Sequence, residues 1–326
     1  MPCWWCDPQQ KEISLQEQKK VTPVGLINLF SVYFIWGSTY LAIRIGIKEG
    51  SGFQPFWFGG IRVLVAGTIL VLWGALRKKK VIPNRKDLLV LAASGLLFWI
   101  GGNGMVILAE RRLDSGLAAL IIATTPLWVA LFESILDRRM PSILLVASLI
   151  TGFGGIVILS YPLLSSGIRA DVLSVLALLF ASLSWSSGLV LQARRPVSVG
   201  RGVNSGYQQL FGGVFFTLIA LLMREPLPAP TQEAWWALGY LILFGSIIAF
   251  TSFVSALQLL PASLVTTYAY VNPVIAVILG WLILREPISG WTVAGGIFVL
   301  AGVSGIFQVN NQKRKKAAEF AVESSD

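Results

Sequence analysis

The stretch TTYAYVNPVIAVILGWLILREP, residues 266–287, holds an Asn-Pro pair inside an apolar run of helix length. Proline inside a helix removes one backbone hydrogen bond and clashes with the carbonyl four residues earlier, which costs about 3 kcal/mol. The surroundings of Pro273 must therefore tolerate this cost or use it. The composition of the whole chain shows what those surroundings are.

The chain is too apolar to fold around a single water-soluble core. It is 55% hydrophobic and 13% charged, whereas soluble proteins are roughly 25% charged. A helix needs about 20 apolar residues to cross a bilayer, and such segments lie at 24–44, 56–76, 88–109, 116–136, 142–161, 172–192, 206–223, 235–256, 262–284 and 291–308. The sequence therefore predicts an all-α polytopic membrane protein with ten transmembrane helices, short loops and no soluble domain.

The distribution of basic residues predicts the orientation. Residues 1–23 lack the features of a cleaved signal peptide and form a predicted cytoplasmic tail, as do residues 309–326. With both tails in the cytoplasm, most of the 26 Lys and Arg residues fall on the inner side, as expected for an inner-membrane protein. The basic runs at 77–80 and 313–316 are expected to meet anionic lipid headgroups, so no nucleic-acid partner is implied.

The two halves of the chain share an order of features. A shift of 147 residues places Pro126 on Pro273, Arg138 on Arg285 and Gly155 on Gly302. We therefore predict two five-helix repeats, residues 24–161 and 162–308. Because five is odd, the second repeat enters the membrane from the opposite side, so the repeats are inverted.

Three segments carry a family resemblance: WGSTYLAIRIGIKEGSGFQPFWFGGIRVLVAGTIL (36–70), TTPLWVALFESIL (124–136) and YVNPVIAVILGWLILREP (270–287). Over residues 24–308 the chain resembles the EamA family of the drug/metabolite transporter superfamily. The resemblance implies a ten-helix inner-membrane carrier that exports amino acids or other small metabolites, with a cavity lined by helices 1, 3, 4, 6, 8 and 9. One departure is the charged turn after the fourth helix, which reads Asp137, Arg138, Arg139, whereas Glu286 in the second copy fits the family pattern.

Polar and aromatic residues near the middle of the spans are the predicted substrate contacts. Tyr268 and Asn272 share one helix face, as do Trp36 and Tyr40, and aromatic rings hold amphipathic or cationic ligands. An alternative is that these rings only pack or face lipid and that the prolines are only packing kinks. The predicted substrate-binding residues are Trp36, Tyr40, Asn103, Thr124, Thr125, Trp185, Tyr268 and Asn272, with Pro126 and Pro273 as helix kinks.

Two charged residues lie well inside the predicted spans, Arg62 and Glu133. Intramembrane charges are costly and often functional. Glu133 is the predicted proton-coupling residue, with a place in the hydrated end beside Asp137 as the alternative. Arg62 is expected near the outer interface with Arg44, where the pair would anchor the helices or attract a carboxylate.

The amino-acid composition excludes several classes of membrane enzyme. The chain has no histidine, which excludes an H-E-x-x-H zinc protease and a Ser-His-Asp triad. Cys3 and Cys6 lack further ligands, so no metal or cofactor is expected. We predict a secondary transporter that exports or exchanges small metabolites by alternating access; the alternatives are a passive channel and a non-transporting scaffold. The predicted partners are a small-molecule substrate and membrane lipid, and the glycine-rich fifth and tenth helices are expected to be scaffold or contacts between copies.

Overall fold

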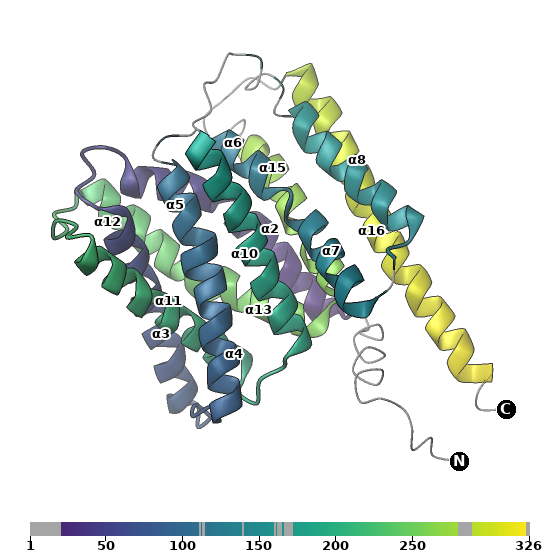
Figure 1. Cartoon of the computed structure of the whole chain (residues 1–326), viewed down its shortest axis with the longest axis horizontal. Coiled ribbons are helices and arrows are strands. Elements are labelled where there is room, and N and C mark those ends of the chain that lie inside the picture. The colour runs from purple at the N-terminus through teal and green to yellow at the C-terminus, as the bar shows by residue number, and fades with distance from the viewer. Residues whose placement is uncertain are drawn as a thin grey trace.

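The computed structural model describes residues 21–110, 112, 115–138, 140–159, 161, 165, 172–279 and 289–323, and all secondary structure in these residues is helical (Figure 1). Eight helices are long and apolar enough to cross a membrane, and a further apolar helix, Ile143–Ile158, is shorter. These observations confirm an all-helical, multi-pass membrane protein. The predicted span 262–284 runs into residues outside the described ranges, so the arrangement of ten helices in two repeats stays a prediction.

The helices follow the predicted spans closely, with several spans divided into shorter elements. In chain order they are α2 (Pro23–Ile47), α3 (Pro55–Leu76), α4 (Arg85–Gly95), η1 (Leu96–Gly104), α5 (Met105–Glu110), α6 (Ser115–Ile122), α7 (Thr125–Asp137), α8 (Ile143–Leu159), α10 (Val172–Arg194), α11 (Arg201–Leu222), α12 (Gln232–Tyr240), η2 (Leu241–Ala249), α13 (Phe250–Leu259), α14 (Ala262–Val265), α15 (Tyr268–Leu279) and α16 (Gly290–Glu323). Helix α16 continues well past the predicted end of the last span at residue 308.

Glycines set two of the closest helix contacts. Helix α8 lies antiparallel to α16 at one edge of the bundle (Figure 1), and a Cβ added at Gly302 would lie 2.5 Å from the backbone nitrogen of Gly152. Helix α3 meets α11 in the same way, because a Cβ at Gly67 would lie 2.7 Å from the carbonyl oxygen of Gly206. Small residues allow such backbone approach between membrane helices. The glycine-rich fifth and tenth predicted helices thus pack on each other.

The start of α2 and the region around Asn310 of α16 lie at the same end of the bundle. Gly25 packs against Leu260, and Ser263 hydrogen-bonds with Asn310. Most described basic residues gather at this end, which we call the basic end: Arg77, Lys78, Lys79, Lys80, Arg85, Lys86, Arg138, Arg194, Arg195 and Arg201. The opposite end holds Arg44, Lys48, Arg112 and Arg224 among the described residues.

Two spans contain a π-helical segment at their centre. Element η1 interrupts the third predicted span and η2 interrupts the eighth. π-Helical turns shift the backbone hydrogen-bond pattern and occur frequently at functional sites. Element η1 lines the cavity described below, and η2 accepts hydrogen bonds from two of the lining side chains.

Two other spans are broken by threonine pairs. The hydroxyls of Thr124 and Thr125 donate to the carbonyls of Ile121 and Ile122, each at 2.7 Å. Thr267 donates to the carbonyl of Leu264 at 2.6 Å and ends α14 in the same manner. Such side-chain bonds offer the backbone an alternative to the regular helix.

The structure separates the roles of the two prolines. The chain leaves helical structure at 123–124, and Pro126 lies in the first turn of α7, where a missing N–H costs nothing. The break between α6 and α7 comes just before Pro126, so its role as a helix kink stays a prediction. Pro273 does lie inside a helix, α15, as predicted.

Replacing Gly302 by alanine should destabilise the α8–α16 contact, because the new Cβ would lie 2.5 Å from the Gly152 nitrogen. We expect a loss of about 1–3 kcal/mol, measured as a lower melting temperature in detergent. Gly296→Ala on the same helix is the matched control, since a Cβ there meets nothing within 4 Å. Equal melting temperatures for the two variants would contradict this packing.

Candidate functional site

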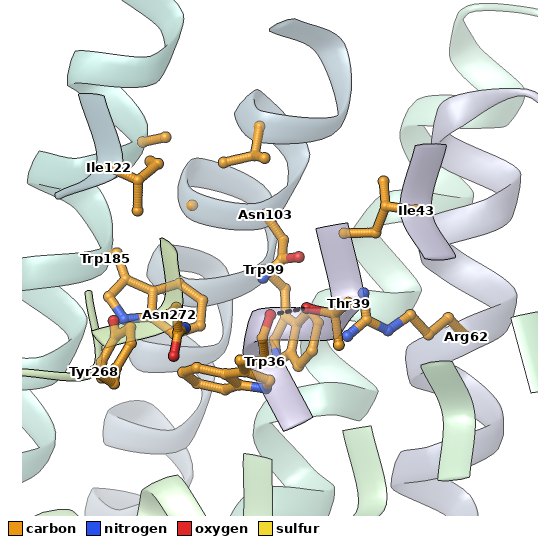
Figure 2. A pocket seen from close by; sticks show the side chains of 13 residues that line it. Trp36, Thr39, Ile43, Arg62, Trp99, Asn103, Ile122, Trp185, Tyr268 and Asn272 are labelled. Atoms are coloured by element: carbon orange, nitrogen blue, oxygen red, sulfur yellow. Dashed lines mark hydrogen bonds between the residues drawn. The ribbon is translucent and has the colours of Figure 1, made fainter. Parts of the chain in front are cut away.

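A cavity of about 80 Å³ lies among α2, α3, η1, α5, α6, α10 and α15 (Figure 2). This volume holds several water molecules, so in this conformation the cavity accommodates a small molecule. Its lining is mostly apolar and aromatic with a few polar groups, as is usual for small-molecule sites. The lining residues are Trp36, Thr39, Ile43, Arg62, Trp99, Gly102, Asn103, Val106, Ile122, Ala181, Trp185, Tyr268 and Asn272.

One wall of the cavity is a cluster of aromatic rings. The ring of Trp36 lies 5.6 Å from that of Trp185 and 5.1 Å from that of Tyr268, both edge to face. A second layer, with Phe98 and Phe253, lies behind these rings and is fully buried. Aromatic pairs of this geometry stabilise each other by about 0.5–1.5 kcal/mol beyond burial.

The second ring layer lies on the side of the basic end. Phe253 is close to the end of α13, whose Gln258 accepts a hydrogen bond from Arg201 at 3.2 Å. Phe98 likewise precedes the lining residues of η1 on a span that starts at Arg85. In this conformation the rings therefore separate the cavity from the basic end.

The π-helical segment η2 supplies acceptors for two cavity side chains. The indole N–H of Trp36 donates to the carbonyl of Gly245 at 3.2 Å. The Nε of Arg62 donates to the hydroxyl of Ser246 at 2.9 Å. The local widening of this span thus fixes residues from α2 and α3 around the cavity.

Arg62 lies in the cavity wall, which corrects its predicted place at the outer interface. Its side chain is only 4% exposed, and its guanidinium lies over the ring of Trp99 at 5.4 Å. Among the described residues no carboxylate forms an ion pair with it. The sequence shows that a charge lies in the span, but it does not show whether Arg62 faces the cavity or the outer interface.

The structure brings five predicted contact residues together: Trp36, Asn103, Trp185, Tyr268 and Asn272 line the cavity. Asn272 is nearly buried, and its amide nitrogen, assigned from its surroundings, donates to the carbonyls of Tyr268 and Tyr33 at 3.1 Å each. This side chain therefore ties the proline-containing helix α15 to α2.

Two of the remaining predicted contacts are not among the described lining residues, and the third falls outside the described side chains. Thr124 and Thr125 are not among the lining residues; each hydroxyl lies 3.0 Å from that of Ser182. Tyr40 is on α2, but its side chain lies outside the described part of the chain. Residues 36, 39 and 43 of α2 line the cavity in an i, i+3, i+7 pattern, and Thr39 was not among the predicted contacts.

Two acidic residues of the spans differ in their surroundings. Glu133 is half-buried in α7, one turn before Asp137, which pairs with Arg194 at 2.5 Å near the basic end. Glu110, just outside the predicted third span, was missed. Both of its carboxyl oxygens are buried without a hydrogen-bond partner within the described ranges, one turn beyond the cavity residue Val106.

Comparison with known proteins identifies the family. The sequence pattern of the EamA-like transporter family matches residues 23–161 and again residues 172–308. The chain belongs to this family and is a membrane transporter.

Individual relatives agree with this assignment. The uncharacterized inner membrane transporter YedA of Escherichia coli K12 is 36% identical over 279 residues, which cover 84% of this chain and 88% of that protein. Protein PecM of Dickeya dadantii strain 3937 is 28% identical over 306 residues, which cover 90% and 95% of the two chains. One solved crystal structure shares the fold with a TM-score of 0.74 at 20% identity, covering 88% of this chain and 98% of that one.

Trp36→Phe should keep the ring cluster but remove the donor to the Gly245 carbonyl. We expect a loss of about 1–3 kcal/mol, because a buried acceptor is left unpaired, measured by thermal unfolding in detergent. Trp236→Phe is the control, since this ring is 73% exposed. The same small effect in both variants would show that the Trp36 bond contributes little.

Proposed function

We propose that this protein is a secondary transporter that exports or exchanges small amphipathic metabolites by alternating access between two inverted five-helix repeats. The observation that carries the proposal is the cavity in the interior of the bundle, lined from α2, α3, α10 and α15 with the parts of the third and fourth spans. A site surrounded by separate helices can be exposed to either side by a change in helix packing. The family resemblance makes amino acids and compounds of similar size the first candidates.

Paired features of the two halves support the repeat arrangement. The family pattern matches the chain twice, at 23–161 and 172–308. Each half also carries one π-helical segment, η1 or η2, and one span broken at a threonine pair. The prolines aligned by the repeat, Pro126 and Pro273, have different local roles, so the two halves have diverged in detail.

The charge distribution supports the orientation. If the positive-inside tendency holds, the basic end faces the cytoplasm and both chain ends lie there. The ring layer with Phe98 and Phe253 would then close the cavity on its cytoplasmic side.

A chain of hydrogen-bonded polar side chains lies between the ring layer and the basic end. Ser94 accepts a hydrogen bond from Gln192 at 2.9 Å, Gln192 accepts one from Asn204 at 3.2 Å, and Asn204 accepts one from Gln208. These four side chains are buried between the rings and the basic end. Buried polar groups inside a membrane protein commonly line a water-filled path, which fits a second conformation open to the cytoplasm.

Countertransport in proteoliposomes tests the proposal. A carrier should show saturable uptake of labelled substrate that accelerates when unlabelled substrate is present on the far side. Flux without this acceleration would support a passive channel, and no flux with any bound compound would support a scaffold.

Pro273→Ala and Pro126→Ala should differ. Alanine at 273 restores a helical hydrogen bond inside α15, so we expect equal or higher thermal stability together with slower transport if the irregular helix is used in the cycle. Pro126→Ala lies in the first turn of α7 and should change transport much less. Unchanged uptake kinetics for Pro273→Ala at equal protein levels would assign this proline to packing alone.

A proton gradient, if it drives transport, needs a carboxyl group that changes protonation. Glu133 is the residue predicted from the sequence, and Glu110 is the one whose oxygens lack partners beside the cavity. We expect Glu110→Gln to abolish dependence on the pH gradient while exchange continues, and Glu133→Gln to retain it. Uptake by both variants is measured with and without an imposed gradient, and the opposite result would return the role to Glu133.

A further inference from the structure

Among the described residues that line the cavity, Arg62 is the only charged one, and none is Asp or Glu. No described carboxylate forms an ion pair with it. We propose that Arg62 makes the cavity selective for small molecules that carry one carboxylate beside an apolar body. This assignment rests on the proposed transport function and names its substrate class.

The hydrogen bonds of Arg62 leave most of its donors unused. Its Nε is bonded to Ser246, and its flat face lies over Trp99. No bond from its two terminal nitrogens is observed to any described residue. A guanidinium presents five N–H donors in a planar fork that fits a carboxylate at two points. The bond to Ser246 and the contact with Trp99 hold this fork in place before a ligand arrives.

The electrostatics favour an anion over a cation. An isolated charge in a low-dielectric interior is costly unless it is paired, and a bound carboxylate would supply the missing partner. A cationic ligand in the same cavity would face repulsion with no acidic residue to offset it. A ligand with several negative charges would leave all but one of them without a partner among the described lining residues, which include one cation.

Two indole groups of the wall are unpaired donors within the described part of the chain. The indole N–H groups of Trp99 and Trp185 are buried and have no acceptor among the described residues. The hydroxyl of Thr39 already donates to the carbonyl of Trp36 at 2.8 Å. Buried polar groups are usually bonded, so these unpaired donors also favour a ligand rich in acceptor oxygens.

The cavity has two chemically different sides. Figure 2 shows the Arg62 guanidinium beside Thr39 and Trp99, and Trp185, Tyr268 and Asn272 gathered across from it. A ligand with its carboxylate at Arg62 would place its apolar part against the rings of Trp36, Trp185 and Tyr268. The preferred substrate is thus an amphipathic monocarboxylate of small size.

Three ligands of nearly equal shape test this assignment on the purified protein in detergent. Phenylacetate is an anion at neutral pH, phenylacetamide is neutral and phenethylammonium is a cation. Binding is followed by the fluorescence of the cavity tryptophans and checked by calorimetry. We expect phenylacetate to bind about tenfold or more tightly than the amide, because charge-assisted bonds are the stronger ones, and the cation to bind most weakly.

Variants of Arg62 test whether this residue causes the expected order of affinities, with the acid bound most tightly and the cation most weakly. Arg62→Gln should reduce the affinity for phenylacetate to that for the amide, while the affinity for the amide stays within about twofold of wild type. Arg62→Lys should keep a weaker preference for the acid, since it retains the charge without the fork. Arg224→Gln removes the same charge from an exposed loop and should preserve the full preference.

The outcomes are separable from those of the transport proposal. Equal affinity for acid and amide in the wild type, tighter binding of the cation, or no binding of the acid up to its solubility limit would each overturn the assignment, whether or not Arg62→Gln folds. Acid-selective binding without countertransport would retain the carboxylate site and remove the transport proposal. Countertransport of a neutral or cationic substrate, with no preference for the acid, would retain the transport proposal and remove the carboxylate site.

Discussion

Within a bilayer every backbone N–H and C=O group has to find its partner inside the protein, and the described spans obey this rule almost everywhere as regular helices. The exceptions are the π-helical segments η1 and η2, the threonine breaks at 124–125 and 266–267, and Pro273. Side chains bond to the backbone near η2, the threonine breaks and Pro273: Trp36 donates to the Gly245 carbonyl, the threonine hydroxyls donate to carbonyls three residues earlier, and Asn272 donates to the carbonyl of Tyr33. Several of them meet at the cavity, so the irregular backbone is concentrated where a polar ligand can be held.

The rest of the bundle is built to be close-packed. Glycines let α8 approach α16 and let α3 approach α11 until backbone atoms touch. These contacts leave no space between the helices, because a single added methyl group would overlap the neighbouring helix. The polar chain from Ser94 to Gln208 is buried between the ring layer and the basic end. Close-packed helix pairs around a centre that contains polar side chains suit a protein that changes the accessibility of a central site.

The sequence predicted the parts of this arrangement that depend on local chemistry and spacing. Composition and span length identified the all-helical membrane protein, and the pairing of Tyr268 with Asn272 on one face placed two lining residues correctly. It failed where helix rotation or tertiary contacts decide. Arg62 was placed at the interface because a span alone does not show which face meets a neighbour, and the lining residue Thr39 was missed because the cavity face of α2 follows 36, 39 and 43. The π-helical segments have no recognised residue pattern, and the break before Pro126 depends on threonine bonds.

The account depends most on one cavity serving both sides of the membrane. Its direct test is chemical labelling of Val106→Cys, a half-buried lining position, in a background with Cys3→Ser and Cys6→Ser. A membrane-impermeant maleimide is applied to right-side-out and to inside-out vesicles, with and without a bound substrate. Alternating access predicts labelling from both sides, with a substrate that changes the ratio. Labelling from one side alone under every condition would contradict the account.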